Sequence, residues 1–416
     1  ASSNTFTRGL TVEAGTLRLA AEGVIPFGSG KSNVDVRVSA TLDVNGRAIR
    51  VNGLNGAGLL TNTVGTVQAV AVGDNNATSL FAGAVSPVLR FEKIGQGVHT
   101  FAGRSAMTSP TVSAGTLEVA TPGWIQSGVA ISSNSILRLK TANGLLGEFA
   151  DYAPKANNIT ATGDTNFNSV AALNALFAQQ TITLTTNSFA SGAAFDFGSS
   201  GSNTCVFPGV YQSSARENFI ARWTGRFYAP VAGTYTFATA SDDGSMIFID
   251  GQTVVSNNLF QGYTPYAPKS GSVSLTAGYH AIVIAFYEGT GFQGLTAWVA
   301  FPGGSLIPLP QNLLDEGTTA ANVWAENGLT CAVSGGASTV VVKTGLPTMR
   351  VLGDNSSFAG LWSLLEGALW VGNGGTSGVL GGNAVATATN SVLAFERSDA
   401  ISYAGAISGG CALRQA

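Results

Sequence analysis

Residues 7–20 read TRGLTVEAGTLRLA, and the same cassette returns at residues 108–120 (TSPTVSAGTLEVA) and 358–372 (FAGLWSLLEGALWVG). Gly15, Gly115 and Gly367 occupy equivalent places in the three copies. A short run of β-branched and apolar residues lies on either side of each glycine. A supersecondary unit that recurs in this way indicates a repeat fold whose copies stack on one another.

The composition predicts a folded, all-β protein. The chain has 416 residues, of which 45% are hydrophobic and 10% are charged, too apolar a mixture for disorder. Glycine accounts for 54 residues, and runs of good helix formers are almost absent. The formal net charge is −3, and the Lys and Arg residues are scattered rather than gathered in a basic stripe, which argues against a nucleic-acid partner. The sequence contains no apolar run of about 18 residues, so no membrane-spanning helix is predicted.

The flanking segments, residues 1–143 and 317–416, alternate short β-branched runs with Gly or Asn turns. Residues 34–53, VDVRVSATLDVNGRAIRVNG, show the period-two pattern of strands, broken by turns. Stacked coils of roughly 20 residues, with a rise of about 4.8 Å each, would make an elongated rod. We therefore expect a solenoid that is interrupted in the middle of the chain.

The flanks resemble the autotransporter-associated β-strand repeat, whose members combine a cassette of this kind with a strand of the type LTFNRSDxLTYSGxISG. The matching segments are residues 4–19, 104–119, 355–371 and 392–409. The resemblance implies a right-handed parallel β-helix. It also implies a passive surface scaffold, because no catalytic residue belongs to the motif.

The pattern changes in the middle segment, residues 144–316, where aromatic residues are denser and the alternating runs are longer. Turn signals separate these runs and predict an antiparallel β-sandwich. Three stretches, WTGRFYAPVAGTYTF (223–237), SDDGSMIFIDG (241–251) and FYEGTG (286–291), resemble the PA14 domain. This domain is found in yeast flocculins and in many bacterial surface proteins, so the resemblance implies a β-sandwich displayed outside the cell.

The PA14 resemblance also implies a calcium site. In lectin-like members an adjacent Asp pair, joined by a cis peptide bond, ligates a Ca²⁺ that holds sugar hydroxyls, and Asp242 and Asp243 occupy that position here. Two carboxylates suit an ion that requires six to eight oxygen ligands. We expect Glu288, Gly289 and Thr290 to approach from a second loop. The alternative is that Asp242 and Asp243 only hydrogen-bond their own turn.

The residue inventory argues against an enzyme, although parallel β-helices also carry polysaccharide-cleaving activities. The two histidines, His99 and His280, lie in strand-like runs without a Ser or Cys nucleophile beside them. Acidic residues in the flanks are spread singly rather than in pairs that would serve as acid and base. The prediction is therefore a protein without a catalytic site.

Cys205, Cys331 and Cys411 are far apart and show no CxxC spacing, which argues against a zinc site. We expect buried thiols, with a disulfide as the alternative. The chain begins ASSNT without an initiator Met, which fits a secreted protein whose signal peptide has been removed. The expected location is extracellular or at the cell surface.

Neither end of the chain shows the polar cap with which solenoids usually finish. We therefore predict an extracellular structural subunit that assembles head to tail into a filament with a projecting PA14 domain. The predicted assembly contacts are Ala1, Ser2, Ser3, Cys411, Leu413 and Ala416. Alignment of Leu413 with Leu89 and of Val12 with Val112 leaves a direct join of about 15 residues against about 23 internally, one strand short. The alternative function is a cell-surface adhesin, or an autotransporter-like passenger segment, that binds glycans through a calcium-dependent PA14 domain.

Overall fold

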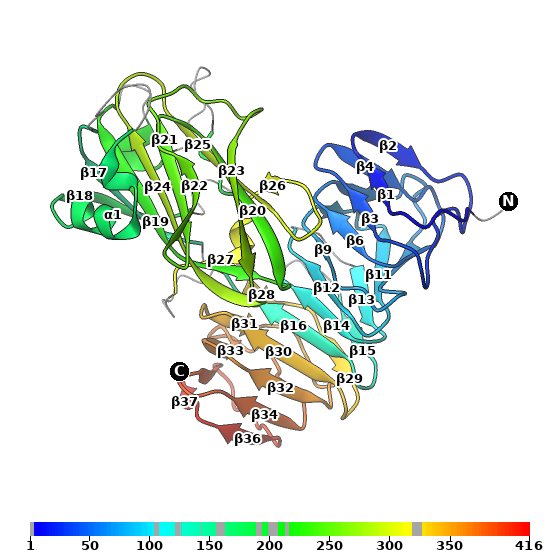
Figure 1. Ribbon diagram of the computed structural model, residues 1–416. Coiled ribbons are helices and arrows are strands. Elements are labelled where there is room, and N and C mark those ends of the chain that lie inside the picture. Colours follow the sequence, from blue (N-terminus) through cyan, green and yellow to red (C-terminus); the bar gives the residue numbers. More distant parts are fainter. Residues whose placement is uncertain are drawn as a thin grey trace. The chain divides into compact units, whose positions relative to one another are not determined.

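The computed structural model describes residues 4–103, 108–120, 125, 127–142, 144–154, 163–188, 194–198, 207–212, 216–317 and 327–416 (Figure 1). The three cassette glycines lie at corners between strands, but the predicted equivalence holds only for Gly15 and Gly367, which follow a strand of the largest sheet, whereas Gly115 precedes one. Gly15 begins β2 (Gly15–Arg18), Gly115 precedes β14 (Thr116–Val119) and Gly367 precedes β33 (Ala368–Gly372). Their φ angles are +71°, +65° and +67°. A Cβ on Gly115 or Gly367 would lie 2.5 Å or 2.0 Å from a carbonyl oxygen of the preceding coil. Close stacking of the coils therefore requires glycine at these two corners.

The described parts of residues 1–142 and 318–416 form one compact unit, a parallel β-solenoid. Its largest sheet has eleven strands in the order β1 (Leu10–Val12), β3 (Val34–Val36), β6 (Leu54–Gly56), β9 (Ser79–Phe81), β12 (Val98–Phe101), β14, β16 (Ile136–Lys140), β30 (Val340–Thr344), β32 (Leu361–Leu364), β34 (Ala384–Thr387) and β36 (Ala406–Gly409). Every described strand pair in this unit is parallel, as expected for successive coils of a solenoid.

Three further parallel sheets form the other sides of the solenoid. The first has the order β10 (Ala84–Val85), β7 (Leu59–Thr61), β4 (Ala40–Asp43), β2. The second has the order β29 (Val333–Gly335), β15 (Val129–Ile131), β13 (Thr108–Val112), β11 (Leu89–Lys93), β8 (Gln68–Val72), β5 (Ile49–Val51). The third has the order β28 (Gly328–Leu329), β31 (Met349–Val351), β33, β35 (Val392–Glu396), β37 (Ala412–Gln415).

The interior of the solenoid is filled by side chains that stack in register from coil to coil. One such row consists of His99, Leu117, Leu137, Val341, Trp362 and Val385, each at most 1% exposed. These side chains belong to one continuous apolar core apart from the histidine. Burial of this core stabilises the fold, because each Leu or Val side chain contributes about 1.5–3 kcal/mol when it leaves water.

The solenoid is continuous across the insertion. Strands β16 and β30 pair directly from Ile136 with Val340 to Lys140 with Thr344, although about 200 residues separate them in the chain. Where the chain leaves the solenoid, the Ala142 N–H donates to Asn327 Oδ1 at 3.3 Å, and Asn327 Nδ2 donates to the Ala142 carbonyl at 3.0 Å. The interrupted coil is thus completed by hydrogen bonds between its two broken ends.

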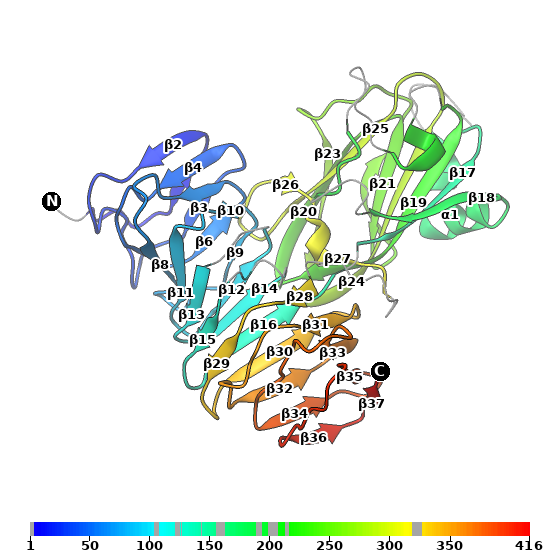
Figure 2. The same ribbon diagram turned by 180° about the vertical axis from the view of Figure 1, so that it is seen from behind.

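The second unit, residues 143–317, is antiparallel throughout its described strand pairs (Figures 1 and 2). Its limits lie one residue from the predicted 144–316. One sheet contains β18 (Ile182–Asn187), β17 (Leu146–Asp151), β19 (Phe219–Ala229), β24 (Gly278–Glu288), β21 (Gly244–Ile249) and β22 (Gln252–Asn257), with β27 (Leu314–Asp315) beside β19. The other contains β23 (Lys269–Leu275), β20 (Gly233–Asp242), β25 (Gly294–Ala300) and β26 (Ile307–Pro308).

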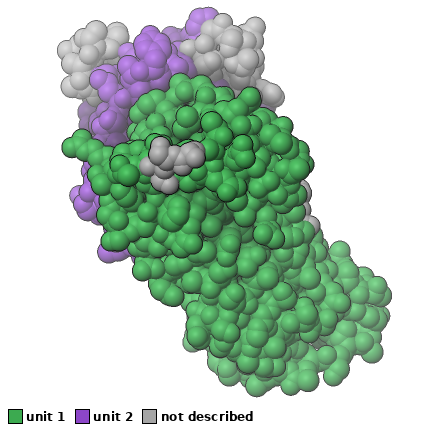
Figure 3. Space-filling view, turned by 90° about the vertical axis from the view of Figure 1, so that its right-hand side faces the viewer, with its two compact units in different colours: residues 1–142, 318–416 green, residues 143–317 purple. Residues whose placement is uncertain are grey.

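One α-helix, α1 (Val170–Phe177), is described in the second unit, besides the short 3₁₀ turns Thr165–Phe167, Gly209–Gln212 and Gln311–Leu313. It begins after Ser169, whose hydroxyl accepts a hydrogen bond from the Ala172 N–H. Leu173 and Phe177 bury its apolar face. Among the described residues, no helix has the length and apolar character needed to cross a membrane. Figure 3 distinguishes the surfaces that belong to the two units.

Candidate functional site

Asp242, Asp243 and Glu288 meet where three neighbouring strands of the second unit end or begin. Strand β20 ends at Asp242, and β21 begins at Gly244, so Asp243 lies in the connection. Strand β24 ends at Glu288 and pairs with β21 through Tyr287 opposite Gly244. In the same antiparallel register, Asp243, the residue before Gly244, lies opposite Glu288, the residue after Tyr287. The Asp242–Asp243 peptide bond is cis, as the PA14 resemblance implies.

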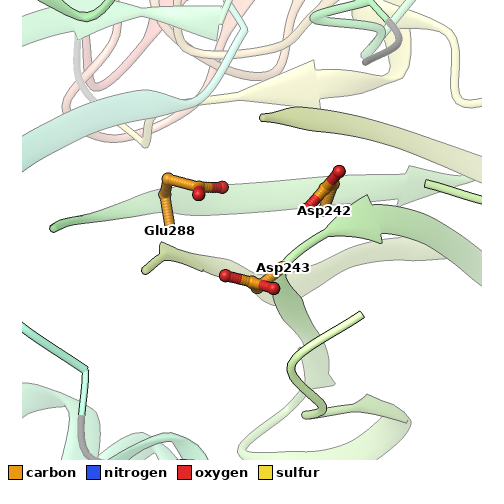
Figure 4. A group of neighbouring side chains, drawn as sticks. All are labelled: Asp242, Asp243 and Glu288. Atoms are coloured by element: carbon orange, nitrogen blue, oxygen red, sulfur yellow. The ribbon is translucent and has the colours of Figure 1, made fainter. Parts of the chain in front are cut away.

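The three carboxyl groups face one another (Figure 4). One oxygen of each lies within 4.8 Å of an oxygen of each of the others. Asp242 and Asp243 are 8% and 6% exposed, whereas Glu288 is fully buried. Neither Glu288 oxygen has a hydrogen-bond partner among the described residues. The arrangement therefore brings three carboxyl groups together in a place that water hardly reaches.

Asp243 fixes two loops by accepting hydrogen bonds from their backbones. Its Oδ1 accepts from the Gln261 N–H at 3.0 Å, and its Oδ2 accepts from the Gly289 N–H at 2.9 Å. These partners are 18 and 46 residues away in the chain, so the Asp243 carboxylate does more than stabilise its own turn. The two bonds orient the carboxylate and tie the loops after β22 and β24 to the same site.

Burial and mutual repulsion disfavour ionisation of the cluster. The pKa of Asp243 is raised by burial, an effect opposed by the hydrogen bonds from Gly289 and Gln261. The pKa of Glu288 is raised to about 10, first by burial and then by the charges of Asp243 and Asp242. A cation between these groups would reverse the effect, because an opposite charge favours the ionised form. The cluster thus has the electrostatics of a cation site.

A polar network supports the connection that carries the two aspartates. Ser241 Oγ lies 2.7 Å from Ser245 Oγ and 3.1 Å from Asn257 Nδ2. Gln261 Nε2 donates to Asn257 Oδ1 at 2.8 Å. These residues hold both sides of the connection in one conformation. Asn257 and Gln261 could not be predicted from the sequence, because only the fold brings the end of β22 and the loop after it to this place.

Gly289 allows the second loop to approach the cluster. A Cβ at this position would lie 2.9 Å from Phe260 Cε1 and 3.1 Å from Asp243 Oδ2. Thr290, the third residue predicted for this loop, is exposed. Phe292, in the same loop, is 57% exposed. The loop therefore contributes a backbone donor at the cluster and an exposed aromatic ring at its tip.

The two histidines serve the fold. His99 is 1% exposed inside the solenoid, where its Nδ1 lies 2.8 Å from Ser79 Oγ. His280 Nδ1 lies 2.7 Å from Asp250 Oδ2, and its Nε2 lies 2.9 Å from the Thr276 carbonyl oxygen. Asp250 and Gly251, both with positive φ, form the hairpin turn between β21 and β22. Each histidine is thus engaged in local structure.

The cysteines and predicted assembly contacts that the structure describes belong to the solenoid unit, not to the inserted domain. Cys331 is buried in the solenoid core and Cys411 is half-buried, both as free thiols. Leu413, on β37, is 60% exposed, and Ala416 is exposed. Cys205 and the residues Ala1, Ser2 and Ser3 lie outside the described part of the chain.

Comparisons with known proteins place the cluster within a PA14 domain. The PA14 domain model matches residues 209–304, a segment that contains Asp242, Asp243 and Glu288. Across 437 aligned residues the chain is 27% identical to the adhesin BmaC autotransporter of Brucella suis biovar 1 (strain 1330). This alignment covers 98% of the chain but only 12% of the adhesin. The chain therefore spans a small part of the relative's length.

Two solved structures of adhesin domains are also similar to part of the chain. The PA14 sugar-binding domain from an RTX adhesin is 26% identical, with a TM-score of 0.32, and the match covers 42% of this chain and 99% of that domain. The epithelial adhesin 6 A domain of Candida glabrata, solved with Galβ1-3GlcNAc, is 15% identical, with a TM-score of 0.30 and coverage of 42% and 87%.

Proposed function

We propose that this β-solenoid with an inserted PA14 domain is an adhesive module, which binds glycans through a calcium ion held by Asp242, Asp243 and Glu288. The observation that carries the proposal is the burial of the Glu288 carboxyl group without a hydrogen-bond partner. Its carboxyl group is fully buried, has no hydrogen-bond partner among the described residues and lies within 4.8 Å of two further carboxyl groups. Such a group is stable in its charged form only beside a cation.

The residues fit Ca²⁺ in the chemistry of their donor atoms. All three side chains offer carboxylate oxygens, the hard ligands that calcium prefers, and the cluster contains no His or Cys that would favour a transition metal. When bound, Ca²⁺ would fill its remaining positions with other oxygens, including sugar hydroxyls. Asp243 orients its carboxylate through Gln261 and Gly289, so the protein itself presets part of the site.

An adhesive role at the cell surface is supported by the match to the PA14 domain and by the likeness to an autotransporter adhesin. In this proposal the solenoid is a scaffold that displays the inserted domain outside the cell. The separation of the chain into two units supports that division, because the carboxyl cluster lies wholly within residues 143–317.

Calcium binding is tested by isothermal titration of the calcium-free protein. We expect one binding site in the native chain and at least a tenfold loss of affinity in both Asp243→Asn and Glu288→Gln, because each loses one charged ligand. Asp250→Asn is the matched control, since Asp250 belongs to the same unit but forms a hairpin turn. Absence of binding by the native chain, or native affinity in both site variants, would contradict the proposal.

Glycan binding is tested on a glycan array, in Ca²⁺ and again after its removal by EDTA. We expect binding that requires Ca²⁺ and is lost in Asp243→Asn. Binding that persists in EDTA would show that the calcium ion does not hold the sugar. No binding to any glycan, with Ca²⁺ bound, would exclude the lectin function.

The predicted head-to-tail filament stays a prediction. Ile407 on β36 and Leu413 on β37 are 39% and 60% exposed, and each strand pairs with a neighbour on one side only in the described structure. An open sheet edge of this kind can pair with a further strand, either of a continuing chain or of a second copy. Negative-stain microscopy of concentrated protein should show filaments that Leu413→Asp shortens. A dispersed monomer would exclude the filament.

A further inference from the structure

The hydrogen bonds around Asp243 form a ring that returns to the chain beside it. The Gln261 N–H donates to Asp243 Oδ1 at 3.0 Å, and Gln261 Nε2 donates to Asn257 Oδ1 at 2.8 Å. Asn257 Nδ2 in turn donates to Ser241 Oγ at 3.1 Å. Because Ser241 lies two residues before Asp243 in the chain, the circuit closes. We call these four residues the Asp243 ring.

The Asp243 ring is anchored in both sheets of the inserted domain. Ser241 belongs to β20 in one sheet, whereas Asn257 ends β22 in the other and pairs with Ser245 on β21. Ser245 Oγ lies 2.7 Å from Ser241 Oγ and donates to Thr239 Oγ1 at 2.8 Å. Ser241, Ser245 and Asn257 are each at most 2% exposed. Buried groups that satisfy one another in this way hold a single arrangement, because a lost partner leaves a polar group away from water.

The two oxygens of Asp243 are held from different directions. Oδ1 faces the ring through Gln261, whereas Oδ2 accepts from the Gly289 N–H at 2.9 Å. The Gly289 carbonyl oxygen accepts from the Asn218 N–H at 2.8 Å, which ties this second support to the beginning of β19. Only the first support depends on Asn257. The Gly289 bond is thus an internal reference for any change that breaks the ring.

We propose that Asn257 and Gln261 are positioning residues of the calcium site: their ring orients the Asp243 carboxylate before the ion binds and so raises the affinity for Ca²⁺. The inference rests on the proposed calcium binding and names side chains outside the carboxyl cluster that set its strength. Groups that orient the ligands of a metal contribute about ten- to a hundredfold to its affinity. A carboxylate that has to be reoriented when the ion arrives loses this contribution.

The first test measures the Ca²⁺ affinity of the full chain by isothermal titration. Gln261→Met keeps the length of the side chain and the backbone N–H but removes the bond to Asn257, so we expect Ca²⁺ to bind about tenfold more weakly. Gln179→Met is the matched control, because Gln179 also donates a side-chain hydrogen bond, to the Ala175 carbonyl oxygen at 3.1 Å, but is exposed beside α1. Its affinity for Ca²⁺ should equal that of the native chain.

The second test follows the ring in the calcium-free protein by amide hydrogen exchange. In the native chain the N–H groups of Gln261 and Gly289 should both exchange slowly, because both donate to Asp243. Asn257→Ala removes the group to which the Gln261 side chain is bound. The Gln261 N–H should then exchange at least about tenfold faster, while the Gly289 N–H stays protected.

The melting temperature of the calcium-free protein separates positioning from a role in the fold. Gln261→Met should shift it by less than about 2 °C although the affinity for Ca²⁺ falls. Unfolding of this calcium-free variant would assign the ring to the fold and overturn the inference. Native Ca²⁺ affinity in both Gln261→Met and Asn257→Ala would overturn the inference alone. Absence of Ca²⁺ binding by the native chain would overturn the proposed function, and this inference with it.

Discussion

The solenoid and the inserted domain both bury charged side chains, but they treat these charges differently. Within the solenoid, Lys343 Nζ donates to the carbonyl oxygens of Gly345, Pro347 and Glu366, and the last two distances are 2.8 Å. In the inserted domain, Glu288 is as deeply buried and has no hydrogen-bond partner among the described residues. The lysine charge is satisfied by the fold, whereas the Glu288 carboxyl group has no such partner in the described part of the chain and burial raises its pKa to about 10.

Lys93 shows that the solenoid uses this device more than once. Its Nζ donates to the carbonyl oxygens of Ile94, Gly95 and Ala114, at 2.5–3.3 Å. Ala114 directly precedes the cassette glycine Gly115, as Glu366 precedes Gly367. Each lysine thus binds its own corner and the corner of the next coil. A buried charge whose hydrogen bonds are satisfied in this way has a structural role, whereas a buried group without a partner requires a separate explanation.

The largest effect should come from a cassette glycine in the stacked part of the solenoid. Gly367→Ala introduces a Cβ 2.0 Å from the Leu346 carbonyl oxygen at a positive φ, and we expect the free energy of unfolding to fall by about 4 kcal/mol. Gly15→Ala is the matched control: its φ is similar, but no atom lies within 4 Å. It should lose only about 1 kcal/mol. Equal losses in chemical denaturation would show that backbone conformation, not coil stacking, requires the cassette glycine.

The next largest effect should come from a satisfied lysine. Lys343→Met keeps the apolar stem but leaves three carbonyl groups without their donor, so we expect a loss of about 3 kcal/mol in the free energy of unfolding. Lys31→Met is the control, because Lys31 binds one carbonyl oxygen at the surface. Its loss should stay below about 0.5 kcal/mol. The free energy of unfolding is measured by denaturant titration. A loss as small as that of the control would show that the hydrogen bonds of Lys343 do not stabilise the solenoid, and Lys343 would then no longer differ from Glu288.

Acid should weaken the solenoid through His99. Burial, with the charge of Lys93 nearby, lowers the pKa of His99 to about 3 from its ordinary value of 6.5. Between these values the unfolded chain binds a proton that the native protein excludes, so stability falls as pH decreases from 6.5. The expected slope is about 1.4 kcal/mol per pH unit. His99→Gln should lose this contribution while still offering a hydrogen bond to Ser79. If the free energy of unfolding of His99→Gln depends on pH between 4 and 6 as steeply as that of the native chain, His99 is not the cause of the acid sensitivity.

The fold could be predicted because its determinants are local and repeated. Each cassette carries its own glycine corner and its own β-branched strands, and the structure places Gly115 and Gly367 where stacking leaves no room for a side chain. The β-sandwich could also be predicted from the sequence, since the Asp250-Gly251 turn joins two strands that are adjacent in the chain. The completion of the broken coil by Asn327 was not predicted, because its partner Ala142 is 185 residues away.

The site could be predicted only in part. Resemblance indicated Asp242 and Asp243, and the FYEGTG run indicated Glu288, which the structure places within 4.8 Å of them. The role of Gln261 follows from a loop that only the fold brings to Asp243. No local pattern marks this residue, because a glutamine in a loop is ordinary in any sequence.

The smallest effect should fall on ligand affinity in the inserted domain. Phe292 is 57% exposed, three residues from Gly289, whose N–H binds Asp243. Three residues span at most about 11 Å, so the ring is within reach of a sugar held at the cluster. If the domain binds glycans as proposed, Phe292→Ala should weaken binding three- to tenfold, or by about 1 kcal/mol, with thermal stability unchanged. Phe27→Ala, which removes a 43% exposed ring from the solenoid, should leave glycan affinity intact. A loss of stability without a loss of affinity would mean that Phe292, like the lysines, serves the fold.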